Sequence, residues 1–223
     1  MYKALFYKEW AKTKRMISLL SFVFLAFVTY AFINTGQWFR VGGAVEVWSS
    51  VILKDLFILP SWIDTLPLLA GLLLGFSQFV PEMTDKRLKL TLHLPLPEFK
   101  IIATMLAYGL FVLFLLFLAT CVILQIGLSF YYPHEIMMSM NLKIAPWLLA
   151  GLTGYLFSAW ICLEPVWKQR VFNALIAICI LMLFHFEERS GAYVPFLPWL
   201  AGFTVISFSF PFYSAARFKE GAQ

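Results

Sequence analysis

Long apolar stretches separated by short polar segments make up most of this chain. Six of them approach or exceed the length that crosses the roughly 30 Å hydrocarbon layer of a bilayer. We predict transmembrane helices over residues 17–35, 62–80, 101–128, 142–163, 171–186 and 197–215. The fifth stretch is short and needs its flanks to complete a crossing. The pattern therefore predicts an all-α membrane protein with one transmembrane domain over residues 1–223.

The first sixteen residues form an amphipathic segment before the first predicted span. Three aromatic side chains, Tyr2, Phe6 and Trp10, recur at helical spacing, and basic side chains occupy another face. Aromatic rings favour the headgroup region of a bilayer, so we predict that residues 1–16 form an interfacial helix. The simpler alternative is a basic anchor that precedes the first span.

A second amphipathic segment covers residues 43–60 and is apolar enough to suggest a seventh span. It carries three charged residues, Glu46, Lys54 and Asp55. A charge in the middle of a membrane costs about 2.5–3.5 kcal/mol even on the lenient insertion scale. We therefore predict an amphipathic helix on the outer surface instead of a further crossing.

Composition and charge support the membrane assignment and orient the chain. Hydrophobic residues make up 61% of the sequence and charged residues 13%, against about half and a quarter in soluble domains. With the N-terminus inside, the predicted cytoplasmic segments hold every Lys and Arg except Arg40, Lys54, Lys143 and Arg189. This asymmetry predicts that both termini are cytoplasmic, in the cytoplasmic (inner) membrane of the cell. The net charge of +5 is then explained by cytoplasmic loops, so we expect no nucleic-acid partner.

The sequence has few features of an enzyme. It has no phosphate-binding P-loop, and His134-Glu135 is not followed by the second histidine of a zinc-protease motif. The three cysteines, Cys121, Cys162 and Cys179, lie in apolar runs without metal-binding spacing. No ionisable side chain lies near the middle of a predicted span, whereas ion-coupled carriers need such groups. We predict no catalytic, cofactor or metal site, and the protein is then either passive or energised by a partner.

The segment from Pro81 to Lys100, PEMTDKRLKLTLHLPLPEFK, carries the most information about function. An acidic residue closes the second span, a basic cluster follows, and a leucine-rich stretch with LPLP leads into the third span. This arrangement resembles the membrane subunits of type-two ABC exporters. The start of the chain, FYKEWAKTKR, is similar to the connecting helix of that family.

The resemblance implies a coupling helix over residues 82–94 that contacts an ATPase subunit. The alternation of the leucines indicates a strand, but a lone strand would leave its edges unpaired, so we favour a short helix that ends before Pro95. The predicted coupling residues are Glu82, Asp85, Lys86, Arg87, Leu88, Leu90 and Leu92. A secondary contact is predicted at Glu164, Lys168 and Arg170.

The resemblance also implies the partners. A separate cytoplasmic ATP-binding cassette subunit would bind and hydrolyse ATP, and a second permease subunit, identical or different, would complete the pathway through the lipid bilayer. The chain itself would be a non-catalytic transport subunit that moves a substrate across or out of the membrane. Two other classes stay open: a non-transporting membrane scaffold or assembly factor, and an intramembrane enzyme, which would need clustered polar groups on facing spans.

Overall fold

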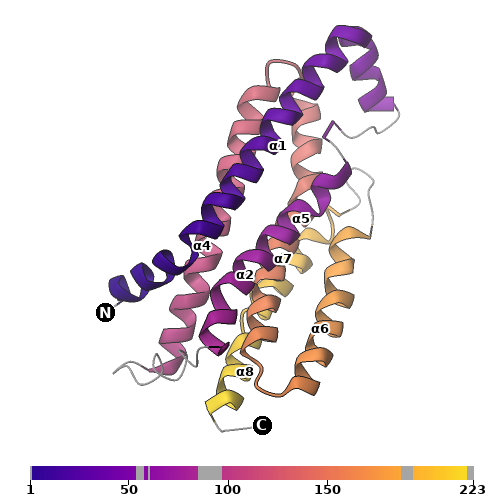
Figure 1. The fold of residues 1–223 in the computed structure, drawn as a ribbon. Helices are drawn as coiled ribbons and strands as arrows, with labels where there is room; N and C mark the ends of the chain where they lie inside the picture. The colour runs from indigo at the N-terminus through magenta and orange to yellow at the C-terminus, as the bar shows by residue number, and fades with distance from the viewer. Residues whose placement is uncertain (1, 54–57, 60, 85–96, 187–192, 220–223) are drawn as a thin grey trace.

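The computed structural model describes residues 2–53, 58–59, 61–84, 97–186 and 193–219, and every regular element within them is helical. With the labels of Figure 1, the elements are α1 (Tyr2–Leu53), η1 (Ser61–Asp64), α2 (Leu66–Thr84), α4 (Glu98–Leu128), α5 (His134–Leu163), α6 (Trp167–Met182), η2 (Leu183–His185), α7 (Leu197–Ser207) and α8 (Phe210–Lys219).

Within the described residues, six helical stretches are long and apolar enough to cross a membrane. They are Tyr2–Leu53, Trp62–Thr84, Glu98–Leu128, His134–Leu163, Trp167–His185 and Leu197–Lys219. Five of them contain one predicted span each, and Trp167–His185 covers the predicted span 171–186 except for its last residue. The prediction of an all-α, multi-pass membrane protein is therefore confirmed.

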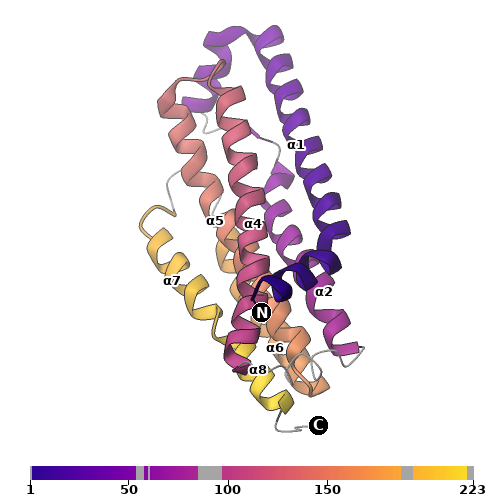
Figure 2. The ribbon, with the colours of Figure 1, turned by 90° about the vertical axis from the view of Figure 1, so that its left-hand side faces the viewer.

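Helix α1 is much longer than the predicted first span and changes direction twice. Its first residues, the darkest part of the ribbon, run at an angle to the rest of the helix (Figures 1 and 2). At the other end, Gly43 adopts φ 70° and ψ 166°, and the last turns of α1 fold back from it (Figure 1). Only glycine takes this backbone conformation readily. Placement of both end segments at the membrane surface stays a prediction.

Prolines mark where several helices begin. Pro97 and Pro133 immediately precede α4 and α5, and Pro198 lies in the first turn of α7. Proline suits these positions because it lacks the N–H that a first helical turn leaves unpaired. The predicted sixth span is interrupted after Ser207, so α7 and α8 divide it between them.

Helix α5 lies at the centre of the bundle and contacts α2, α4, α6, α7 and α8. Its contact with α2 is close enough to require glycine. A Cβ atom added to Gly71 would lie 1.9 Å from the backbone oxygen of Gly151, and one added to Gly75 would lie 1.7 Å from Ser158 Oγ. Small residues let membrane helices approach closely, and these glycines permit the contact of α2 with α5.

Several helix ends and turns lie at the two ends of the bundle. The turn between α4 and α5 and the bend at Gly43 lie at the top of Figure 1, whereas the end of α2, the α5–α6 connection and the end of α8 lie at the bottom. The predicted coupling helix, residues 82–94, begins at this lower end. Its residues 82–84 form the last turn of α2, and residues 85–94 lie outside the described residues.

Candidate functional site: a buried ion cluster at the lower end of the bundle

Three charged side chains meet between the first turns of α1 and the last turn of α2. The ammonium group of Lys12 lies 2.8 Å from Glu9 Oε2 and 2.8 Å from Glu82 Oε1. Glu9 and Glu82 are 1% and 0% exposed. Lys8, on the more exposed side, lies 3.1 Å from the same Glu82 oxygen. We refer to Glu9, Lys12 and Glu82 as the inner ion cluster.

Gln78 extends the inner ion cluster into the centre of the bundle. Its side-chain amide donates to Glu9 Oε2 at 3.0 Å and to the backbone oxygen of Met105 at 2.9 Å. Its carbonyl oxygen accepts a 2.8 Å hydrogen bond from the hydroxyl of Tyr155. Gln78 and Tyr155 are both fully buried. One hydrogen-bonded network therefore joins α1, α2, α4 and α5.

A second contact fastens α1 to α4 next to this network. The hydroxyl groups of Thr13 and Tyr108 lie 2.9 Å apart, and the ring of Phe6 packs edge-on against the ring of Tyr108. Thr13 is fully buried, while its hydroxyl also donates to the backbone oxygen of Glu9. The start of α1 is therefore held by both ionic and neutral contacts.

Helical spacing explains why these side chains meet. Glu9, Lys12 and Thr13 lie three and four residues apart, so they share one face of α1, and Gln78 and Glu82 share one face of α2 in the same way. A polar face in an apolar protein is costly to bury unless a matching polar face covers it. The polar faces of α1 and α2 pack against each other and so meet this requirement. One oxygen of each glutamate, Glu9 Oε1 and Glu82 Oε2, still accepts no hydrogen bond within the described residues.

A separate cluster surrounds Glu164, at the connection between α5 and α6. Glu164 is fully buried and accepts a 2.7 Å hydrogen bond from the hydroxyl of Ser214 in α8. Its other oxygen forms an ion pair with Arg217 at 3.1 Å, without the geometry of a hydrogen bond. Arg170 donates to the backbone oxygen of Glu164 at 2.7 Å. The α5–α6 connection is thus tied to the last helix of the chain.

The predicted coupling residues have different environments. Glu82 and Glu164 are buried, so their carboxylates act inside the protein and not on its surface. Lys168 is exposed, and Arg170 is half-buried with its guanidinium over the ring of Trp167. The other predicted coupling residues lie outside the described residues, namely Asp85, Lys86, Arg87, Leu88, Leu90 and Leu92.

Sequence analysis did not identify Glu9, Gln78 or Tyr155 as site residues. The available signal was the spacing of Glu9 and Lys12 together with that of Gln78 and Glu82, which gives each helix a short polar stripe. Tyr155 gave no such signal. Its apolar neighbours are typical of any packed helix, and only the fold brings its hydroxyl to Gln78.

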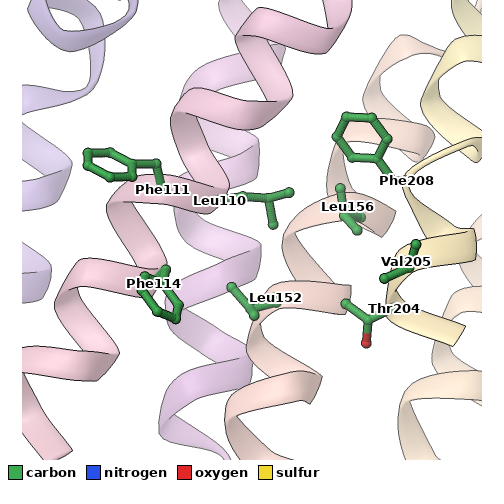
Figure 3. A pocket seen from close by; sticks show the side chains of 8 residues that line it. All are labelled: Leu110, Phe111, Phe114, Leu152, Leu156, Thr204, Val205 and Phe208. Atoms are coloured by element: carbon green, nitrogen blue, oxygen red, sulfur yellow. The ribbon is translucent and has the colours of Figure 1, made fainter. Parts of the chain in front are cut away.

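A second feature of the bundle is an apolar pocket of about 410 Å³ between α4, α5 and α7, drawn in Figure 3. Phe111 and Phe114 line one side of it, and Val205 and Phe208 line the other. The single polar side chain, Thr204, is already hydrogen-bonded to the hydroxyl of Thr153. The pocket therefore offers hydrocarbon contact and no reactive group.

The polar contacts of both clusters join one helix to another. Among the residues that the structure describes, no group of three or more His, Cys, Asp or Glu side chains is placed to bind a metal ion. Comparisons with protein families, with curated proteins and with solved structures find no match for this chain. The fold and site define the class of the protein: a multi-pass helical membrane protein with a buried ion cluster at one end.

Proposed function

We propose that this chain is the permease subunit of an ABC transporter, energised by a separate cytoplasmic ATPase. The observation that carries the proposal is the position of the inner ion cluster. Glu82 lies three residues before segment 85–96, whose sequence resembles the ATPase-contacting loop of type-two ABC exporters. The cluster fastens the base of that segment to α1 and, through Gln78, to the bundle.

Such an attachment suits a subunit whose helices are moved by conformational changes of a partner ATPase. A movement imposed on a loop reaches the membrane helices only if the base of the loop is fixed to them. Buried charges serve this purpose because separating them leaves uncompensated charge in a low-dielectric interior, which costs about 3–5 kcal/mol for a buried pair. The start of α1, the end of α2 and the middle of the bundle would therefore move together.

The Glu164 cluster provides a second point of attachment. It fixes the α5–α6 connection, which carries the predicted secondary contact residues Lys168 and Arg170, to Ser214 and Arg217 of α8. Helix α8 is itself joined to the start of α4 by the ion pair of Lys219 with Glu98, at 2.7 Å. Each of the two loops proposed to contact the ATPase therefore begins at a glutamate that is ion-paired to another helix, Glu82 to α1 and Glu164 to α8.

The proposal assigns ATP binding and hydrolysis to the partner. The chain would pair with a second permease subunit in the cytoplasmic membrane, with both termini inside the cell, and the substrate would move along the interface between the two halves. The charge asymmetry of the loops supports this orientation.

The proposal can be tested by purifying the tagged chain from its native membranes in a mild detergent. We expect an ATP-binding cassette protein to co-purify, identified by mass spectrometry, together with ATP hydrolysis in the eluate. A parallel purification of a variant with Leu90 and Leu92 both changed to Asp should recover the membrane chain without that protein.

The other functional classes would give different results. Stable co-purification with membrane proteins alone, and no ATPase in any detergent tested, would contradict the transporter and favour a scaffold or assembly factor. Chemical turnover of a lipid or peptide by the isolated chain would contradict it in favour of an intramembrane enzyme.

A further inference from the structure

We propose that the outer end of the α4–α5 hairpin binds a soft monovalent metal ion, Cu(I), through His134, Met137 and Met138. These side chains line one open pocket of about 750 Å³ beside the turn between the two helices. The turn lies at the end of the bundle opposite the inner ion cluster (Figure 1). The inference is independent of the proposed transport function.

Helical spacing brings the three candidate ligands together. His134 is the first residue of α5, and Met137 and Met138 follow at three and four residues, so all three project from one face of the first turn. Neighbours at these spacings have Cβ atoms about 5–6 Å apart, and methionine has enough rotatable bonds for its sulfur to close the remaining distance. His134 and Met138 are exposed, while Met137 forms the inner wall at 6% exposure.

The chemistry of the lining selects the ion. Thioether sulfur favours Cu(I), and imidazole is an accepted second donor, whereas Mg²⁺, Ca²⁺ and Mn²⁺ prefer carboxylate oxygens. The described lining contains no Asp or Glu, and its remaining polar side chains are hydroxyl and amide groups, those of Gln125, Ser129, Tyr132 and Asn141. A neutral site of two sulfurs and one nitrogen suits a monovalent cation better than a divalent one.

Methionine is also a suitable ligand on the side of the membrane where the charge asymmetry of the loops places this hairpin. Disulfides form and persist in oxidising compartments outside the cytoplasm, which would remove cysteine thiols as ligands. A thioether cannot form a disulfide.

The test is an anaerobic titration of the detergent-purified full chain, made without a histidine tag, against Cu(I) held by a chromophoric chelator. Cys121, Cys162 and Cys179 are replaced by Ala throughout, so that their thiols do not compete. We expect one Cu(I) per chain, with sulfur and nitrogen neighbours in X-ray absorption spectra.

Variants then distinguish Cu(I) binding at this site from Cu(I) binding elsewhere on the chain. Loss of a residue that only hydrogen-bonds to a metal ligand lowers metal affinity by about 10–100-fold. Loss of two ligands themselves, in the double variant His134→Ala and Met138→Leu, should therefore weaken Cu(I) binding by at least about a hundredfold. Met140→Leu is the matched control, because Met140 lies on the same helix and in the same buried cluster as Met137 but outside the pocket lining.

Three results would overturn the proposal. The parent chain takes no Cu(I) from the chelator, or the double variant binds Cu(I) with unchanged affinity. A preference for Zn²⁺ over Cu(I) would contradict the assignment of a soft-metal site. Both substituted side chains are exposed, and equal thermal stability of the variants would show that a loss of binding does not reflect unfolding.

Discussion

Replacing Lys12 by Met tests whether the inner ion cluster holds the start of α1 to the bundle. Methionine keeps most of the length of lysine and removes only the ammonium group. Glu9 and Glu82 would then lie buried without the cation that contacts both at 2.8 Å. Breaking a buried ion pair from one side costs about 3–5 kcal/mol. Lys8 still reaches Glu82 at 3.1 Å, which favours the lower end of that range.

The expected loss of about 3 kcal/mol corresponds to a large change in thermal stability. For chains of this size, 1 kcal/mol shifts the Tm by about 2–4 °C, so Lys12→Met should lower the Tm in detergent by about 6–12 °C. Lys219→Met is the matched control, because Lys219 pairs with Glu98 at 2.7 Å but both side chains are exposed. An exposed pair contributes about 0–1 kcal/mol.

A triple variant distinguishes the loss of the cation from a general loss of packing. Glu9→Gln, Lys12→Met and Glu82→Gln together remove every charge of the cluster, and uncharged replacements of buried ion pairs are often close to neutral. The triple variant should therefore be more stable than Lys12→Met alone. Equal Tm values for Lys12→Met and Lys219→Met, or a triple variant less stable than the single one, would refute the reasoning.

Two further predictions concern the helix contact and the orientation of the chain. Gly71→Ala should destabilise the protein by about 1–3 kcal/mol or more, since its Cβ would lie 1.9 Å from the backbone oxygen of Gly151. Gly36→Ala should be neutral or stabilising, because no atom lies within 4 Å of the Cβ it would add. Similar Tm values for the two variants would contradict this prediction. In intact cells and a cysteine-free background, an impermeant thiol reagent should label Glu135→Cys and not Lys86→Cys, and the reverse pattern would overturn the predicted topology.

Much of the fold could be predicted from the sequence because the bilayer fixes the length of an apolar helix. Five of the six predicted spans lie within one apolar helical stretch of the structure, and the fifth, 171–186, extends one residue beyond the stretch Trp167–His185. The ends were harder to predict, because the hydrophobic pattern does not mark where a helix continues beyond the membrane. Helix α5, for example, starts at His134, eight residues before its predicted span.

The candidate site could be predicted only in part. Glu82 was identified from the sequence, but its burial against Lys12 depends on how α1 packs against α2, which periodicity within one helix does not report. Gln78 is a neutral residue within the second predicted span, and its position alone does not indicate a partner. It is hydrogen-bonded to Glu9, 69 positions earlier in the sequence, and to Tyr155, 77 positions later, so only the fold brings these residues together.

Retention of an ATPase by the segment after Glu82 is the most direct test of the proposed transport function. The measurement is a detergent pull-down of the co-purifying ATP-binding cassette protein by the wild-type chain and by the variant with Leu90 and Leu92 changed to Asp, with ATP turnover assayed in each complex. Burial of one leucine stabilises an interface by about 1.5–3 kcal/mol, so two charged replacements should lower the affinity by orders of magnitude. We predict that the double variant inserts normally into the membrane and loses the ATPase, while Lys219→Met retains it. Full binding and full turnover by the double variant would contradict the proposal.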